Sequence, residues 1–155
     1  MHPANPGSLL EATFERIRIE RMADMPMVNP ALSVVAVDFD RKNDDWRGVL
    51  VTPWGINLLL LPAVQEWPVP GSHERAFRQY ASGTFAFLPN HEDELGDYLA
   101  CSLIHDMAQF EDQETAVLTA RACLIALDLA PENPVPDPAV PERLERRRFF
   151  TGSPG

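Results

Sequence analysis

The sequence predicts an α+β domain in which an antiparallel β-sheet packs against one helix near each end of the domain. Short β-branched and apolar stretches with brief links fill the middle of the chain, and helical periodicity marks its two flanks. The 155 residues, 45% of them hydrophobic, suffice for one core. We therefore expect a single domain over residues 8–130, a disordered N-terminus at residues 1–7, and a Pro-rich flexible linker and basic tail at residues 131–155.

The N-terminal helix is expected to begin at Ser8 and to end near Asp24. Ser8 and Glu11 have the spacing of a capping box, in which each side chain accepts a hydrogen bond from a backbone N–H that the helix leaves free. The apolar residues on one face of this helix are Leu10, Phe14 and Ile17. Pro26 ends the helix, because proline disfavours the helical conformation of the residue before it.

Three methionines, Met22, Met25 and Met27, cluster where this helix is expected to end. Methionine is adaptable and recurs on binding surfaces that accept several partners, but it also fills irregular gaps in cores. We prefer the second interpretation and expect these side chains to fill the core.

The next segments predict an antiparallel meander of three strands. Residues 32–39 are β-branched and alternate, residues 40–45 form a polar loop, and residues 46–52 return as the partner strand. Pro53-Trp54-Gly55 is typical of a turn, because proline fixes φ and glycine adopts conformations closed to other residues. In the third strand, residues 56–61, the last four residues are all Leu and do not alternate. We therefore expect this strand to be central and covered on both faces.

The second half of the domain predicts a hairpin and a helix. Residues 75–80 and 84–88 are joined by Ala81-Ser82-Gly83, which is typical of a hairpin. Residues 98–110 fit no single element: their start could be a further strand and their end a turn. Residues 112–129 predict a helix, because an acidic first turn suits the helix dipole and small residues recur on one face.

Charge and hydropathy exclude several classes of partner. Thirteen Lys and Arg against 23 Asp and Glu give a net charge of −10, which disfavours nucleic acid and anionic lipid. Residues 142–150 carry four Arg and two Glu, a local excess of positive charge on an acidic protein. No apolar run approaches the roughly 18 residues that span a bilayer, and the N-terminus lacks the features of a signal peptide. We expect a cytoplasmic protein without membrane insertion.

Candidate catalytic and metal-binding residues are few. Cys101 and Cys123 are the only cysteines and belong to no Cys-x-x-Cys pair, so neither a disulfide framework nor a zinc ribbon is expected. Ser102, His105 and Asp106 supply the residue types of a hydrolase triad, but three residues so close in sequence rarely converge. Cys101 and His105 could share a metal, with His73 or His91 as further ligands, although a buried thiol near a histidine is commoner. We assign no catalytic residue, metal or cofactor, and interpret the chain as a binding module.

Several stretches, in order along the chain, resemble one known family. They are Leu10-Glu-Ala-Thr-Phe14, Asn29-Pro-Ala-Leu-Ser-Val34, Gly48-Val-Leu-Val-Thr-Pro-Trp54, Asn57-Leu-Leu-Leu-Leu-Pro62, and Tyr98-x-x-Cys-Ser-Leu103 with Met107 and Phe110. Together they resemble the HybE/HupJ/HoxT family of nickel-iron hydrogenase assembly chaperones over residues 9–130. Gly55-Ile56 departs from the family pattern, which has a bulkier aromatic followed by Met. Some relatives are fused to a rubredoxin, for which this sequence has no Cys-x-x-Cys pairs.

The resemblance implies a non-enzymatic, cytoplasmic accessory protein for maturation of the hydrogenase small (iron–sulfur) subunit. The expected partner is the precursor of that subunit, with its twin-arginine export signal as one candidate for the bound part. The resemblance also admits three other roles or partners: protection of iron–sulfur cluster assembly when oxygen is present, a bridge between hydrogenase subunits, and contact with the large subunit or other maturation proteins.

The client-binding face that we predict joins the turn at residues 52–54 to the segment at residues 98–110. Trp54, Tyr98 and Phe110 would be apolar anchors, while Thr52, Asn57 and Ser102 would hydrogen-bond to a client backbone. The full set is Thr52, Pro53, Trp54, Asn57, Tyr98, Cys101, Ser102, Met107 and Phe110. Each of these residues could equally be structural, and Asn57 in particular could fix the turn.

The basic tail contains a motif of its own. Arg146, Arg147, Phe149 and Phe150 have the form Arg-Arg-x-Phe-Phe, close to the Arg-Arg-x-Phe-Leu core of twin-arginine signals. We hypothesise that this segment mimics the client's signal and folds back on the peptide site, tethered by the Pro-rich linker. The alternative is a disordered basic tail with a chance match.

Overall fold

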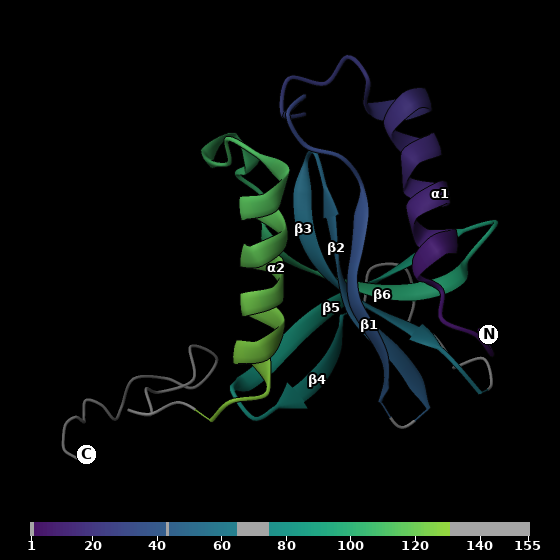
Figure 1. Cartoon of the computed structure of the whole chain (residues 1–155). Helices are drawn as coiled ribbons and strands as arrows, with labels where there is room; N and C mark the ends of the chain where they lie inside the picture. The colour runs from purple at the N-terminus through teal and green to yellow at the C-terminus, as the bar shows by residue number, and fades with distance from the viewer. Residues whose placement is uncertain (1, 43, 65–74, 131–155) are drawn as a thin grey trace, which may run out of the picture.

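The computed structural model describes residues 2–42, 44–64 and 75–130 (Figure 1). In chain order the elements are α1 (Gly7–Ile17), the π-helical turn η1 (Arg18–Met22), β1 (Val35–Lys42), β2 (Asp45–Thr52), β3 (Gly55–Pro62), β4 (Ala76–Tyr80), β5 (Gly83–Glu92), β6 (Gly96–Ile104), the 3-10 turn η2 (Met107–Gln109) and α2 (Gln113–Leu127). All strands pair antiparallel in one six-stranded sheet with the order β1-β2-β3-β6-β5-β4. The predicted α+β class is confirmed, and the tail at residues 131–155 lies outside the described residues.

β3 is the central strand, as its run of leucines predicts. It pairs with β2 along its whole length and with β6 on its other edge. Leu58, Leu59, Leu60 and Leu61 are each at most 3% exposed. The predicted meander is β1-β2-β3 and the predicted hairpin is β4–β5, while the ambiguous segment at residues 98–110 begins as β6.

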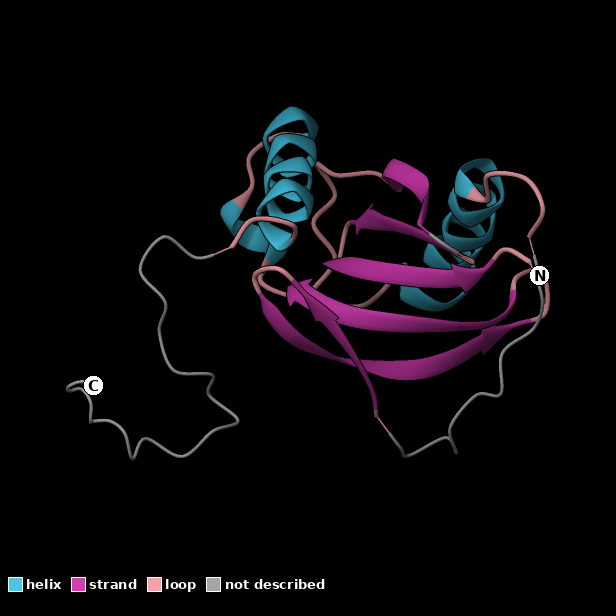
Figure 2. Cartoon of the chain, turned by 90° about the horizontal axis from the view of Figure 1, so that it is seen from below, coloured by secondary structure: helices cyan, strands magenta, loops and turns pink. Residues whose placement is uncertain are grey.

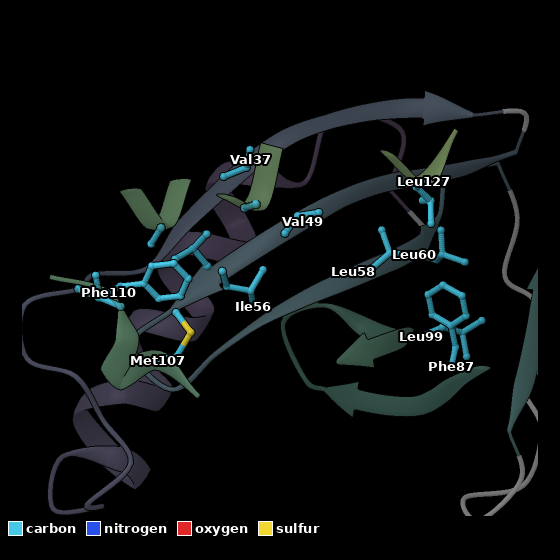
Figure 3. Close-up of a cluster of buried hydrophobic side chains, with 14 residues drawn as sticks. Val37, Val49, Ile56, Leu58, Leu60, Phe87, Leu99, Met107, Phe110 and Leu127 are labelled. Atoms are coloured by element: carbon cyan, nitrogen blue, oxygen red, sulfur yellow. The ribbon is translucent and has the colours of Figure 1, made fainter. Parts of the chain in front are cut away.

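The two helices cover opposite faces of the sheet. Figure 1 shows β1 between them, and Figure 2 shows the two helices apart from each other beside the strands. On one face, α1 packs through Leu10 over Leu50, Leu59 and Leu61. On the other face, α2 lies over a cluster that includes Val49, Val51, Ile56, Leu58, Ala116, Ala120 and Leu127. Figure 3 shows this second cluster running from Met107 and Phe110 at one end to Phe87, Leu99 and Leu127 at the other. Period-2 alternation therefore divides β2 and β3 between two cores.

The chain before α1 is held against the sheet, in contrast to the disorder expected for residues 1–7. The His2 backbone N–H donates to the Pro62 carbonyl at 2.8 Å, and Trp46 Nε1 donates to the His2 carbonyl at 2.6 Å. The predicted capping box is wrong, because the helix starts one residue before Ser8. The Asn5 side chain accepts from the Gly7 N–H, and the Pro6 carbonyl accepts the first helical hydrogen bond.

β1 begins and ends later than predicted. Asp38 adopts φ of 53°, and the register with β2 shifts between Val37 and Asp40. This bulge adds a residue and resets the alternation of the side chains. The strand consequently continues to Lys42, through the first half of the stretch that we interpreted as a polar loop.

A buried arginine fastens the C-terminal end of α2 to the sheet. Arg47 on β2 is only 6% exposed, and its guanidinium donates to both carboxylate oxygens of Asp128, the residue after α2. The Arg47 Cζ lies 5.2 Å from the centre of the Tyr80 ring, within cation–π range. The hydrogen bond from Arg47 lowers the pKa of Asp128 below its ordinary value. A carboxylate is unfavourable at the negative end of a helix, so Arg47 neutralises a charge that the helix dipole opposes.

Gly48 on β2 lies directly under the Phe39 ring. A Cβ atom at this position would fall 2.4 Å from Phe39 Cγ, which is far inside contact distance. We expect Gly48→Ala to lower the free energy of unfolding by about 1–3 kcal/mol, the usual cost of overpacking. Urea denaturation checks this value.

Phe39→Ala provides the control for Gly48→Ala. When the ring is absent, the new methyl group has space, so the double variant should be more stable than the sum of the two single effects predicts. Strict additivity of the two changes would contradict a steric clash.

Candidate functional site

A groove of about 540 Å³ lies between the chain entering β1 and the chain leaving β6. Its walls are residues 26–31 and residues 105–111 apart from Gln109; we call it the end groove. It lies at the end of the sheet that carries the β2–β3 turn, because Asn29 of the first wall hydrogen-bonds to Pro53 in that turn. The two walls are far apart in sequence, and the folding of the intervening strands, from β1 to β6, brings them together.

Asn29 joins the walls of the groove to each other and to the turn. Its Nδ2 donates to the carbonyls of Met107 at 2.9 Å and Phe110 at 2.8 Å. Its backbone N–H donates to the Pro53 carbonyl at 2.8 Å, and its Oδ1 accepts from the Ala31 N–H at 2.9 Å. The side-chain amide thus uses both donors and its acceptor, and together with the backbone N–H it joins the two walls and the turn.

The β2–β3 turn is fixed by Thr52 rather than by Asn57. Thr52 Oγ1 donates to the Gly55 carbonyl at 2.9 Å and accepts from the Trp54 N–H at 3.3 Å. Thr52 is fully buried, and Trp54 is half-buried. The threonine closes the turn internally, which leaves the Pro53 carbonyl for Asn29.

The floor of the groove is apolar and part of its rim is methionine. Met107 and Phe110 are 1% and 5% exposed, so only a small part of each reaches the groove. Met27 lines the groove and is 50% exposed, and the neighbouring Met25 is 41% exposed. The expectation that these methionines fill the core is wrong for Met25 and Met27, because the chain after η1 crosses the end of the sheet at the surface. Their exposure fits the other interpretation, an adaptable apolar surface.

The rim of the groove is acidic. Asp106 and Glu111 line it, and both are exposed. No Lys or Arg occurs in residues 22–40 or in residues 79–120, the stretches that contain the two walls. An apolar floor beside carboxylates, in a lining that contains no Lys or Arg, is complementary to a peptide that carries both apolar and cationic side chains.

The structure brings together part of the predicted client-binding face. Thr52, Pro53 and Trp54 in the turn lie at the same end of the sheet as Met107 and Phe110, linked through Asn29. Of these five, only Met107 and Phe110 line the groove.

The other predicted residues lie apart from the groove. Asn57 and Ser102 pair in register on the α1 face, whereas Cys101 packs against the core on the α2 face. Tyr98 lies under α1, with its ring 6.4 Å from that of Phe14. Burial raises the pKa of Tyr98 to about 12, with Glu92 adding to the effect. Tyr98 is therefore an interior, neutral side chain.

The residues considered for catalysis or metal binding do not assemble. Within the described residues, no group of three His, Cys, Asp or Glu side chains is placed to hold a metal ion. Burial raises the pKa of the Cys101 thiol, which disfavours the thiolate that binds metals or attacks carbonyls. Ser102, His105 and Asp106 are all exposed and follow one another along the end of β6 and the turn after it. His73 lies outside the described residues.

Residues 26–31 and the pair His105 and Asp106 were absent from the predicted binding face. Asn29-Pro30 was available as a signal, since it opens one of the stretches that resemble the family. The stretch by itself gives no reason to expect that the Asn29 side chain bonds to two carbonyls 78 and 81 positions away.

Comparison with known proteins places the chain in a family. Residues 5–152 match the family described as NiFe-hydrogenase assembly, chaperone, HybE. "Probable rubredoxin HupJ" of Rhodobacter capsulatus is 39% identical over 90% of this chain, which spans 50% of that protein. "Protein HoxT" of Cupriavidus necator is 35% identical, with 92% of this chain and 86% of HoxT covered. "Hydrogenase-2 operon protein HybE" of Escherichia coli K12 is 30% identical, with coverage of 94% and 89%.

The fold agrees with this assignment. The solution structure of HybE from Escherichia coli matches with a TM-score of 0.67 at 26% identity, covering 91% of this chain and 87% of that one. Both the sequence match and the structural match extend over nearly the whole chain. The protein therefore belongs to the HybE family of nickel-iron hydrogenase assembly chaperones.

Proposed function

We propose that this protein is a non-enzymatic chaperone that binds the precursor of the hydrogenase small (iron–sulfur) subunit in the cytoplasm, before export. We further propose that the end groove receives the precursor's twin-arginine signal. The observation that carries the proposal is the pairing of an apolar floor with two exposed carboxylates, Asp106 and Glu111, on a rim without Lys or Arg.

The chemistry of the signal matches the groove in two respects. A twin-arginine signal presents two guanidinium groups followed by apolar side chains. Guanidinium groups bind carboxylates through charge-assisted hydrogen bonds, which suits Asp106 and Glu111. Apolar side chains suit the exposed Met27 and the floor over Met107 and Phe110. The net charge of −10 would also attract a basic segment from a distance.

Replacement of the two carboxylates by amides tests the proposal. We expect Asp106→Asn/Glu111→Gln to weaken binding of the purified precursor roughly 3- to 30-fold at low salt, because two exposed ion pairs are lost. The difference from wild type should shrink at high salt, where exposed charges are screened. Calorimetry with the small subunit, made with and without its signal, measures both effects.

Asp44→Asn/Asp93→Asn is the matched control. Both residues are exposed and lie in hairpin turns at the other end of the sheet, so this variant changes the net charge equally. It should bind like wild type. If both variants weaken binding equally, the effect comes from the overall charge of the protein. If the precursor binds equally well with and without its signal, the folded subunit is the client.

A further inference from the structure

The basic aromatic segment at residues 146–150 is the feature that the proposed function leaves unused. It lies outside the described residues, and its sequence is Arg-Arg-Arg-Phe-Phe. We infer that this segment occupies the end groove of the same molecule when no client is bound, and that a client must displace it. The role as a competitor rests on the proposed function, whereas the contact itself does not.

Charge complementarity favours the end groove over a second, apolar hollow in the described part of the chain. That second hollow, about 250 Å³, lies between α2 and the sheet and is lined by side chains such as Phe85, Leu103 and Leu124, with no charged residue. It could accept the two phenylalanines but offers nothing to three arginines. The end groove offers Asp106 and Glu111 together with an apolar floor.

A third hollow of about 410 Å³ is lined by Asp38, Asp40 and Asp128, but Lys42 and Arg47 line it as well. Two of its carboxylates are already paired, Asp128 with Arg47 and Asp38 with Arg121. Of these three hollows, only the end groove combines an apolar floor with carboxylates in a lining that contains no Lys or Arg.

The tail is long enough to reach the groove. Ala130 ends the described chain just beyond the C-terminal end of α2, and the groove wall at Glu111 immediately precedes its N-terminal end. The 15 residues of α2 span about 22 Å. Residues 131–145 precede the segment and include five prolines, so in an extended form they cover about 45 Å. The linker therefore spans the helix with length to spare.

The segment lies within the range of residues that the family model matches. The match to the HybE family continues to residue 152, beyond Phe150. A tethered segment also needs little intrinsic affinity, because a short linker holds it at a millimolar effective concentration. A weakly bound segment of this kind would cover the apolar floor of the groove and would be displaced by a client that binds more tightly.

Methionine and leucine methyl resonances of the full-length protein test the contact without any client. We expect Phe149→Ser/Phe150→Ser to shift the methyl signals of Met27 and Met107, which line the end groove. The leucines of the second hollow, Leu103 and Leu124, should not shift. Val135→Ser/Val140→Ser removes the same number of apolar side chains from the linker and should leave both groups unchanged.

Two results would overturn the inference. The first is that the methyl signals of Met27 and Met107 do not change in the Phe149→Ser/Phe150→Ser variant. The second is that the signals of Leu103 and Leu124 shift instead, which would place the tail in the second hollow.

Competition between the tail and a client is tested separately. Removal of residues 142–155 should raise the affinity for a twin-arginine peptide about two- to tenfold. An unchanged affinity would refute competition. If the methionine signals shift but the peptide binds neither the full-length nor the truncated protein, the contact would be supported and the proposed function refuted.

Discussion

Asp128→Ala is expected to lower the free energy of unfolding by about 3 kcal/mol, although Asp128 itself is half-exposed. The cost arises at Arg47, which is 6% exposed and would lose both hydrogen-bond acceptors. An unpaired buried charge costs more than the ion pair contributes when it is intact. Chemical denaturation at pH 7 measures the loss.

Arg47→Met/Asp128→Ala is the control for this interpretation. The double variant removes the positive charge of Arg47, which Asp128→Ala leaves buried without a partner, and keeps its apolar volume. Most of the lost stability should therefore return. A double variant that is less stable than Asp128→Ala would show that the arginine acts mainly through packing against Tyr80.

The same ion pair gives a dependence on pH with a definite sign. Arg47 lowers the pKa of Asp128 in the folded protein, so the contribution is complete above the ordinary aspartate pKa of 3.8. It disappears as the pH falls through the lowered value. The stability difference between wild type and Asp128→Ala should therefore be constant near neutral pH and should narrow below pH 3.8.

Asn29→Ala is expected to lower the free energy of unfolding by about 2–3 kcal/mol. It removes the two donors to the carbonyls of Met107 and Phe110 and the acceptor for the Ala31 N–H. Each polar group left without a partner away from water costs about 1 kcal/mol or more. Binding of the small-subunit precursor should fall as well, because the walls of the end groove would separate. Denaturation and calorimetry measure the two losses.

Asn29→Asp separates hydrogen bonding from side-chain volume. It keeps the acceptor but turns a carboxylate toward two carbonyl oxygens, which should raise its pKa in the folded state. Its protonated form can donate one hydrogen bond, so this variant should lose less stability at pH 4 than at pH 7 relative to wild type. Equal losses at both pH values would indicate that the two donor bonds contribute little.

The features predicted correctly are those set by short-range patterns. The unbroken leucines place β3 at the centre, and the small residues on one helical face place α2 against the sheet. β1 was misplaced because the bulge at Asp38 shifts the alternation by one residue, and no local pattern announces a positive φ at an aspartate. The capping box at Ser8 failed because Asn5 and Pro6 supply the helix start one residue earlier.

The candidate site was only partly predictable because its contacts are non-local. The motifs drew attention to Thr52 to Trp54 and to Met107 and Phe110, but alternation cannot tell a core residue from one at the floor of a groove. Met27 and Asp106 acquire significance only when residues 26–31 lie beside residues 105–111. Likewise, Asp128 resembles an ordinary helix terminus until Arg47 is found next to it, 81 positions away.

The distance in sequence between the groove walls also determines when the site can exist during synthesis. Asn29 bonds to residues 78 and 81 positions further on. On the ribosome, residues 26–31 emerge long before their partners, and closing so large a loop has an entropic cost that only the completed sheet offsets. A nascent or partly folded copy therefore has no groove, and under the proposed function each copy must finish its own folding before it can bind a client there.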